Sequence, residues 1–244
     1  MLLAVDSGNT KIKAAVFEGN VMLAKYISDK TEPLIFFEKI FKQHPEITSS
    51  VLSNVGNHDA DAVNFLKSTT HFTEVNRETL FPFTNQYATP ETLGIDRMVL
   101  SAGATLAYPA QNRLVIDAGT CVTYDFTDAG GNYLGGAISP GLQLRYRAMH
   151  TFTAKLPLLS REMPGPYIGD TTASSMHSGA VNGLLYEIEG FVSRYEKDYG
   201  SVTVILTGGD ADFLAKRLKN TIFANPNFLL ESLGLLYQYI TEND

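Results

Sequence analysis

Tryptophan is absent from the sequence, and cysteine and histidine are scarce, with one and five residues. The single cysteine, Cys121, excludes an internal disulfide bond and a zinc site built on several cysteines. Cys121 lies in an apolar stretch, so we expect it to be a small residue of the core. The histidines lack the short spacings at which histidines bind zinc; they are His44, His58, His71, His150 and His177. A fold held by disulfide bonds or by a zinc ion is therefore not expected.

An excess of positive charge and long apolar runs are also missing. Lys and Arg number 19 against 26 Asp and Glu, which gives a net charge of −7. Proteins that bind nucleic acid usually present a basic surface, so no nucleic-acid partner is expected. No segment reaches the roughly 18 apolar residues of a membrane span, and Met1 is followed directly by an apolar strand without a basic stretch. We therefore expect no membrane partner and no signal peptide, and a cytoplasmic protein.

Three common catalytic motifs do not occur. The sequence has no Gly-x-x-x-x-Gly-Lys-Ser/Thr loop and no Gly-x-Gly-x-x-Gly turn, which are the central elements of P-loop and Rossmann nucleotide sites. It also lacks the Gly-x-Ser-x-Gly turn of many esterases. Any nucleotide site must therefore be built in another way.

One pattern that is present occurs twice. An apolar strand runs into an Asp-x-Gly-Asn/Thr turn at residues 2–10 and again at residues 114–120, and each turn is followed by a second apolar strand. The glycine permits a tight turn that brings backbone N–H groups close to a ligand, and the short polar side chains beside it suit phosphate oxygens. The carboxylates, Asp6 and Asp117, suit a cation rather than phosphate. We interpret the two turns as the two sides of one nucleotide site.

The rest of the chain predicts a mixed α/β fold in two lobes. Each repeat opens a meander of three strands, over residues 2–28 and 113–138, and helices are expected over 33–43, 59–68, 94–107, 142–150, 173–198 and 227–240. The order βββαβαβ in the first half is typical of a mixed sheet with flanking helices. We expect two lobes, residues 1–112 and 113–244, each with a mixed five-stranded sheet.

Two further turns carry candidate functional residues. A strand over 201–206 ends in Thr207-Gly208-Gly209 before a helix, and such a turn leaves N–H groups without side chains above them, where adenine or ribose can lie. Asp96 and Arg97 stand in the first turn of an otherwise uncharged helix. An acidic residue there is stabilised by the helix dipole, and the adjacent opposite charges equally suit a functional pair.

These motifs together resemble a known family. Two Asp-x-Gly-Asn/Thr turns and a Gly-Gly turn resemble the superfamily of acetate and sugar kinases, heat-shock ATPases and actin, and imply two ribonuclease H-like (actin-like ATPase) lobes. Within it, the chain closely resembles type III pantothenate kinases over nearly its whole length. The specific part is Tyr87-x-x-Pro90-x-x-Leu93-Gly94-Ile95-Asp96-Arg97, supported by Asp6–Thr10, Ile116–Thr120 and Gly135–Gly141.

The resemblance implies ATP-dependent phosphorylation of pantothenate to 4'-phosphopantothenate, the first step of coenzyme A biosynthesis, by a homodimer. Asp96 would be the general base. The residues implied for ATP and its phosphates are Asp6, Ser7, Gly8, Asn9, Thr10, Lys11, Ile12, Lys13, Thr120, Gly208 and Gly209. Those implied for pantothenate are Tyr87, Gly94, Ile95, Asp96, Arg97 and Thr172. The implied cofactors are Mg²⁺ on the side of Asp6 and a monovalent cation, K⁺ or NH₄⁺, at Asp117.

Two alternative functions stay open at this point. One is a kinase of the same superfamily that acts on another small hydroxyl substrate. The other is a nucleotide-binding regulator without catalysis. The alternation of Lys11 and Lys13 equally suits a solvated strand face.

Overall fold

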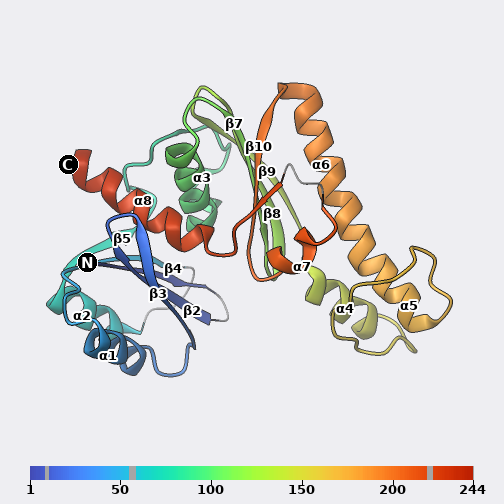
Figure 1. Ribbon diagram of the computed structural model, residues 1–244, viewed down its shortest axis with the longest axis horizontal. Coiled ribbons are helices and arrows are strands. Elements are labelled where there is room, and N and C mark those ends of the chain that lie inside the picture. Colours follow the sequence, from blue (N-terminus) through green and yellow to red (C-terminus); the bar gives the residue numbers. More distant parts are fainter. Residues whose placement is uncertain (9–10, 55–58, 219–221, 244) are drawn as a thin grey trace. The chain divides into compact units, whose positions relative to one another are not determined.

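The computed structural model describes residues 1–8, 11–54, 59–218 and 222–243. The chain forms two compact units, one made of Met1–Pro109 with Asn227–Asp244 and the other of Ala110–Pro226. Figure 1 shows the elements of each unit in the colours of the sequence.

Unit 1 is built around a mixed sheet of five strands in the order β3-β2-β1-β4-β5. The pairs β1–β2 and β2–β3 are antiparallel, whereas β1–β4 and β4–β5 are parallel. The elements are β1 (Leu2–Ser7), β2 (Lys11–Glu18), β3 (Val21–Asp29), α1 (Pro33–Gln43), β4 (Ser49–Asn54), α2 (Ala60–Thr69), β5 (His71–Val75), β6 (Thr84–Asn85), the 3₁₀ turn Pro90–Thr92, α3 (Ile95–Ala107) and α8 (Phe228–Asn243).

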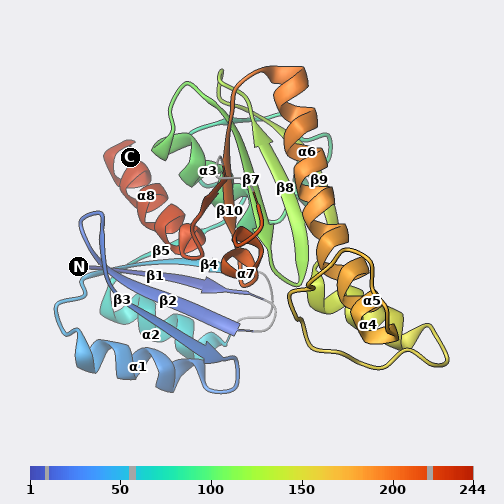
Figure 2. The ribbon, with the colours of Figure 1, turned by 45° about the vertical axis from the view of Figure 1, so that its right-hand side comes forward.

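Helices cover both faces of this sheet, as Figure 2 shows. Leu3 and Val5 of β1 pack in one apolar cluster with residues of α1 and α2, and Leu2 and Ala4 pack in another with residues of α3 and α8. Successive strand residues point to opposite faces, so a strand buried on both sides is apolar throughout. This explains the unbroken apolar run before Asp6.

The expected division into 1–112 and 113–244 differs from the structure at the C-terminus. Helix α8 belongs to unit 1, because its apolar residues complete the core on α3 and β1. The two helices approach closely where Gly103 faces Ser232, and a Cβ atom on Gly103 would lie 2.0 Å from the Ser232 hydroxyl oxygen. The small side chains of α3 therefore allow α8 to pack closely against it.

Unit 2 repeats the topology of unit 1. Its own strands follow the order β11-β10-β7-β8-β9 within a six-stranded sheet, with β7–β8 and β8–β9 antiparallel and β7–β10 and β10–β11 parallel. The elements are β7 (Asn112–Ala118), β8 (Cys121–Thr127), β9 (Asn132–Pro140), α4 (Leu142–Thr151), α5 (Thr172–His177), a π-helical turn (Ser178–Asn182), α6 (Gly183–Tyr199), β10 (Val202–Thr207), α7 (Ala211–Ala215) and β11 (Ile222–Ala224). The predicted α/β fold with two repeated, mixed sheets is confirmed.

One face of the second sheet is covered by α6. Tyr124 and Phe126 of β8 stack on Phe191 and Tyr195 of that helix, with ring centroids 4.2 and 4.7 Å apart. Alternate residues of β8 point to the other face, and Cys121 is exposed there. The expectation that Cys121 is a core residue is therefore wrong. None of the helices in the described parts of the chain combines the length and apolar character needed to cross a bilayer.

Candidate active site

The first Asp-x-Gly turn leaves β1 at Asp6, whose side chain is only 4% exposed. The sheet register sets Asp6 beside Lys13 of β2 and beside Ser53 of β4. Directly paired residues share a face of the sheet, so these three polar residues form a row at the end of the apolar face. The turn is closed by the Gly8 N–H, which donates to the Lys11 carbonyl oxygen at 3.1 Å.

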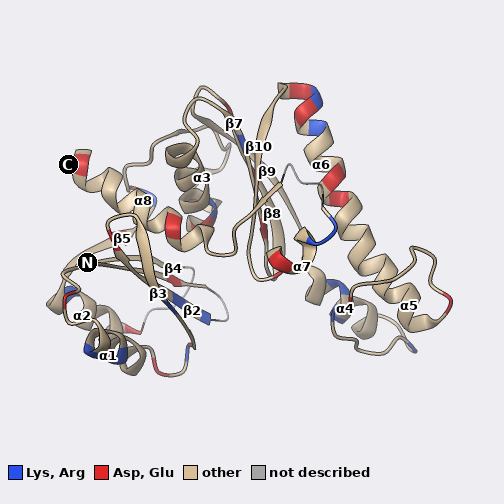
Figure 3. Cartoon of the chain, viewed as in Figure 1, with Lys and Arg blue, Asp and Glu red and all other residues tan. Residues whose placement is uncertain are grey.

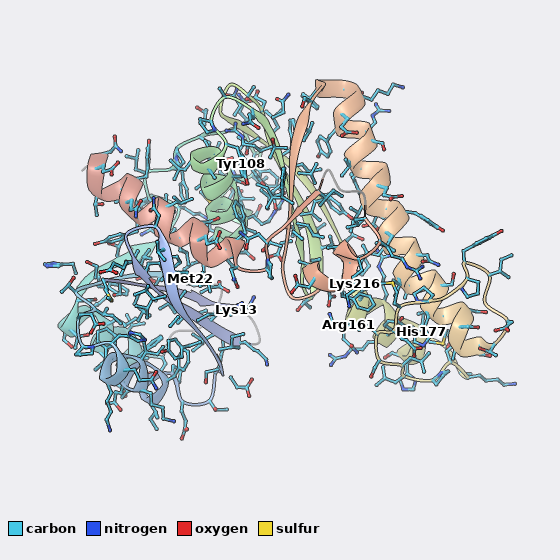
Figure 4. The ribbon with its side chains drawn as sticks, in the orientation of Figure 1. Lys13, Met22, Tyr108, Arg161, His177 and Lys216 are labelled. Carbon is cyan, nitrogen blue, oxygen red and sulfur yellow. The ribbon has the colours of Figure 1, made fainter. Side chains whose placement is uncertain are left out.

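The other residues expected at this turn differ in exposure. Lys11 is exposed and Lys13 is half-buried, and basic residues at the start of β2 stand out in Figure 3. Figure 4 shows Lys13 at the side of that strand. The Ile12 side chain is buried in the apolar cluster beneath α1 and α2, so only its backbone is available to a ligand. Asn9 and Thr10 lie outside the described residues.

The second turn repeats this arrangement at the end of β7. The register sets Asp117 beside Thr123 of β8 and Thr207 of β10. The Gly119 N–H donates to the Cys121 carbonyl oxygen at 2.9 Å, which corresponds to the bond made by Gly8. The N–H groups of the two turn glycines therefore close the turns, so any backbone N–H groups that face a ligand must come from other turn residues.

The Gly-Gly turn after β10 lies directly against the second Asp-x-Gly turn. The Asp210 N–H donates to the Ala118 carbonyl oxygen at 2.9 Å. Gly208 has a φ angle of 94°, and a Cβ atom on it would lie 2.3 Å from Oδ1 of Asp117 and 2.5 Å from the Ala118 oxygen. Only glycine fits this conformation and this space. The structure thus brings Gly208, Gly209 and Asp117 together within unit 2.

The start of α4 holds the second turn from another side. The Gly141 N–H donates to the Thr120 carbonyl oxygen at 3.1 Å, and a Cβ atom on Gly141 would lie 2.2 Å from the Gly119 oxygen. One turn further along α4, Arg145 donates through Nε to the Pro140 oxygen at 2.8 Å. Thr120 therefore lies in a turn that packs against the Ser139–Gly141 segment.

Arg145 is part of a polar network that sequence reasoning missed. Its guanidinium donates to Ser139 Oγ at 3.0 Å and to Glu187 Oε2 at 2.6 Å, and the Tyr124 hydroxyl donates to Glu187 Oε1 at 2.8 Å. Burial acts to raise the pKa of Glu187, but the hydrogen bonds from Arg145, Ser139 and Tyr124 outweigh it and hold the pKa below its ordinary value. Burial and the bond to Glu187 raise the pKa of Tyr124. The one sequence signal was the position of Arg145 one helical turn after Gly141.

The candidate acceptor site lies at the start of α3 in unit 1. Gly94 is the N-cap residue, and Oδ1 of Asp96 accepts a hydrogen bond from the Arg97 N–H at 2.9 Å. A Cβ atom on Gly94 would lie 2.4 Å from that oxygen, so the glycine leaves room for the carboxylate over the helix start. Asp96 and Ile95 are partly exposed.

Arg97 and Tyr87 come together although they lie on different segments. The Arg97 guanidinium is 5.7 Å from the centre of the Tyr87 ring, a distance typical of a cation–π contact. Arg97 is only 6% exposed, and the Tyr87 N–H is fixed by Asn85 Oδ1 at 3.0 Å. Two residues expected to bind the substrate, Tyr87 and Arg97, are therefore in contact within unit 1. Thr172 belongs to unit 2, where it is exposed at the start of α5 behind its capping residue Thr171.

The described part of the chain contains no metal centre made of protein ligands alone. Within residues 1–8, 11–54, 59–218 and 222–243, no three His, Cys, Asp or Glu side chains gather as they do around a bound metal ion. Asp6 and Asp117 lie near the ends of β1 and β7. A cation can be bound by one carboxylate together with substrate phosphates or main-chain carbonyl groups.

Comparison with solved structures supports the fold. A protein from Campylobacter jejuni described as a Baf family transcriptional activator superimposes with a TM-score of 0.64 at 18% identity, covering 99% of this chain and 100% of that chain. Glucokinase from an Antarctic psychrotroph superimposes with a TM-score of 0.54 at 13% identity, covering 97% and 98%. At these identities the likeness concerns the fold alone.

Comparison with related sequences identifies the family of this chain. The model of the family described as type III pantothenate kinase matches residues 2–194. Type III pantothenate kinase from Flavobacterium johnsoniae is 57% identical over 100% of both chains, and that from Flavobacterium psychrophilum is 52% identical over 98% of this chain and 99% of its own. The resemblance carried by the two Asp-x-Gly turns and the Asp96–Arg97 pair is confirmed, and the chain belongs to the type III pantothenate kinase family.

Proposed function

We propose that this protein transfers the γ-phosphoryl group of ATP to the hydroxyl group of pantothenate, which gives 4'-phosphopantothenate and ADP in the first step of coenzyme A biosynthesis. The observation that carries the proposal is family membership over the whole chain, at 57% identity to a type III pantothenate kinase. The partly exposed carboxylate of Asp96 supports it, because a kinase of this kind needs an accessible base for the acceptor hydroxyl.

Asp96 would act as the general base. Its carboxylate would accept the hydroxyl proton while the hydroxyl oxygen attacks the γ-phosphorus and the bond to the bridging oxygen of ADP breaks. Phosphoryl transfer depends mainly on positioning and on charge stabilisation, so one aligned carboxylate suffices. Arg97, held beneath Tyr87, would orient pantothenate together with the backbone at Gly94 and Ile95. Thr172 would contact the substrate from the start of α5.

The phosphates of ATP would lie at the two Asp-x-Gly turns and its adenosine at Gly208 and Gly209. Because the Gly8 and Gly119 N–H groups are already bonded, phosphate contacts would come from the hydroxyl groups of Ser7 and Thr120 and from the Lys13 cation. Lys11 is more exposed than Lys13 and would contribute charge only.

Two cations fit the donors that are present. Mg²⁺ in kinases is bound by one or two carboxylates together with substrate phosphates, so Asp6 would suffice on the protein side. A monovalent cation, K⁺ or NH₄⁺, fits Asp117, because Oδ1 of Asp117 and the main-chain carbonyl oxygen of Ala118 both border Gly208. When bound, these cations would neutralise negative charge on the phosphates.

We further propose that the enzyme is a homodimer and works in the cytoplasm. Unit 2 exposes large apolar side chains on the end of α4, on the segment that follows it and at the start of α6; they are Phe152, Leu158, Tyr167, Ile168 and Tyr186. Apolar side chains gathered on neighbouring segments are typical of an interface. Light scattering should give the mass of two chains, and Phe152→Asp with Tyr167→Asp should give one. A monomeric wild type would contradict this, and Leu80→Asp, an exposed site in unit 1, is the control.

One assay distinguishes the proposed function from two alternatives, a kinase for another hydroxyl substrate and a nucleotide-binding regulator. Release of ADP is measured with ATP, Mg²⁺ and pantothenate in K⁺, and again with Na⁺ in place of K⁺. Turnover that requires pantothenate and falls in Na⁺ supports both the substrate and the cation site. Turnover without pantothenate dependence would indicate a kinase for another hydroxyl substrate. Tight ATP binding without turnover would indicate a regulator.

A further inference from the structure

The long segment between α4 and α5, residues 152–171, has no helix or strand of its own. Segments of this length in a compact unit are usually either functional or disordered. This one is attached to the rest of unit 2 at several points. Pro164 accepts a hydrogen bond from Arg217, and the Tyr167 carbonyl oxygen accepts one from Ser178. It is therefore an ordered part of the unit.

Arg161, in the middle of this segment, contacts the Gly-Gly turn. Its guanidinium forms an ion pair with Asp210 and donates to the Gly209 carbonyl oxygen at 3.4 Å. It also lies over the ring of Phe213 in α7, 5.2 Å from the ring centre. Figure 4 labels Arg161 on this segment and Lys216 directly after α7. One side chain thus contacts the turn, the residue after it and the helix that follows.

Asp210 connects this contact to the candidate nucleotide site. Its N–H donates to the Ala118 oxygen, so the residue that pairs with Arg161 is also bonded to the second Asp-x-Gly turn. Its side chain is 14% exposed, whereas that of Arg161 is 44% exposed. A planar guanidinium that is both paired and stacked has few orientations open to it. The Gly208–Gly209 turn is therefore held by Ala118, through the Asp210 N–H, and by Arg161, through the Asp210 carboxylate and the Gly209 carbonyl oxygen.

We propose that Arg161 is a positioning residue for the nucleotide: it holds the Gly209–Asp210 backbone in the conformation that receives the adenosine of ATP. The proposal rests on the function proposed above for the Gly208–Gly209 turn. Glycines have no side chain to restrict the backbone, so a turn with two of them needs an external contact to stay in one conformation. Arg161 provides that contact and needs no bond to ATP.

The test is calorimetric binding of MgATP together with steady-state kinetics. Arg161→Ala is expected to raise the Kd and the KM for ATP about tenfold, equivalent to one hydrogen bond with a charged partner. We expect kcat and the KM for pantothenate to stay within about twofold, since the acceptor residues of unit 1 are untouched. Arg161→Lys keeps the charge but loses the fork and the stacking, and should recover part of the affinity.

Two arginines provide matched controls. Arg194 forms an exposed ion pair with Asp198 on α6, and Arg194→Ala should leave ATP binding unchanged. Arg217→Gln releases the same segment at Pro164, away from the turn. An equal rise of the KM for ATP in Arg217→Gln and Arg161→Ala would show that loosening of the segment is the cause, and would overturn the proposal. Unchanged ATP affinity in Arg161→Ala would overturn it as well.

A double-mutant cycle supplies a readout that general destabilisation would not mimic. If Arg161 acts through Asp210, then Arg161→Ala added to Asp210→Asn should cost little further ATP affinity, and additive losses would contradict the pairing. Failure of the underlying site is distinguished by Gly208→Ala. If the wild type binds MgATP and Gly208→Ala binds it equally well, the turn is not the nucleotide site, whatever the Arg161 variants do.

Discussion

Glu187 of α6 accepts a 2.6 Å hydrogen bond from Arg145 of α4, and this contact joins the helix that covers the second sheet to the segment that packs on Thr120. Removing one partner of such a partly buried pair leaves the other without its counter-charge. The pair therefore links the stability of unit 2 to the position of a candidate phosphate residue.

The first prediction concerns acid stability. The pKa of Glu187 is held below the ordinary value of 4.5, chiefly by Arg145 once the opposing effect of burial is overcome. Since the folded pKa is lower than the unfolded pKa, the stabilisation is complete above pH 4.5 and is lost as the pH falls through the folded value. Denaturant unfolding of Glu187→Gln should show reduced stability at neutral pH and a smaller further loss in acid. Glu196→Gln, an exposed site on the same helix, should keep the wild-type profile.

The second prediction concerns the general base. Asp96→Asn should fold normally and bind MgATP as the wild type does, while kcat falls by about 10²–10⁴-fold, because the hydroxyl proton loses its acceptor. Rapid-quench measurement of the first turnover would locate the loss in the chemical step. Glu91→Gln, an exposed acid in the 3₁₀ turn before α3, is the matched control. Near-normal turnover of Asp96→Asn would remove Asp96 from the mechanism.

The third prediction separates two adjacent glycines. Gly208 has a φ angle of 94°, and a Cβ atom there would meet Asp117 and Ala118, whereas no described atom lies within 4 Å of a Cβ atom built on Gly209. Gly208→Ala should therefore lower the free energy of unfolding by roughly 1–3 kcal/mol, the usual cost of a strained backbone conformation. Gly209→Ala should change it by less. Equal stability of the two variants in urea titrations would count against the close packing of the turn.

The fourth prediction concerns the first turn. Asp6→Asn removes the carboxylate proposed for Mg²⁺ and should raise the Mg²⁺ concentration needed for half-maximal turnover. Lys11→Gln changes an exposed residue of β2 and should have little effect. A Mg²⁺ titration of both variants is the measurement. An unaltered Mg²⁺ requirement in Asp6→Asn would contradict the proposed role of Asp6.

Much of the fold could be predicted from local patterns in the sequence. The residues before Asp6 are apolar because β1 is buried on both faces of the sheet. A strand buried in this way can be recognised in the sequence by its unbroken apolar run. The helix after Gly94 and the turn after Thr207 were also expected, since caps and glycine turns depend on neighbouring residues. Cys121 was misjudged, because an apolar stretch does not show which face of the sheet a residue occupies.

The two strand-turn repeats, the α/β class and the family could all be predicted from local sequence, because each of these depends on residue types at short spacings. Three other features became apparent only in the folded protein: α8 completes unit 1, Gly208 packs on Asp117, and Arg161 pairs with Asp210. These contacts join residues far apart in the chain. They depend on which apolar faces and which charges meet when the sheets and helices pack, and no local pattern encodes that choice.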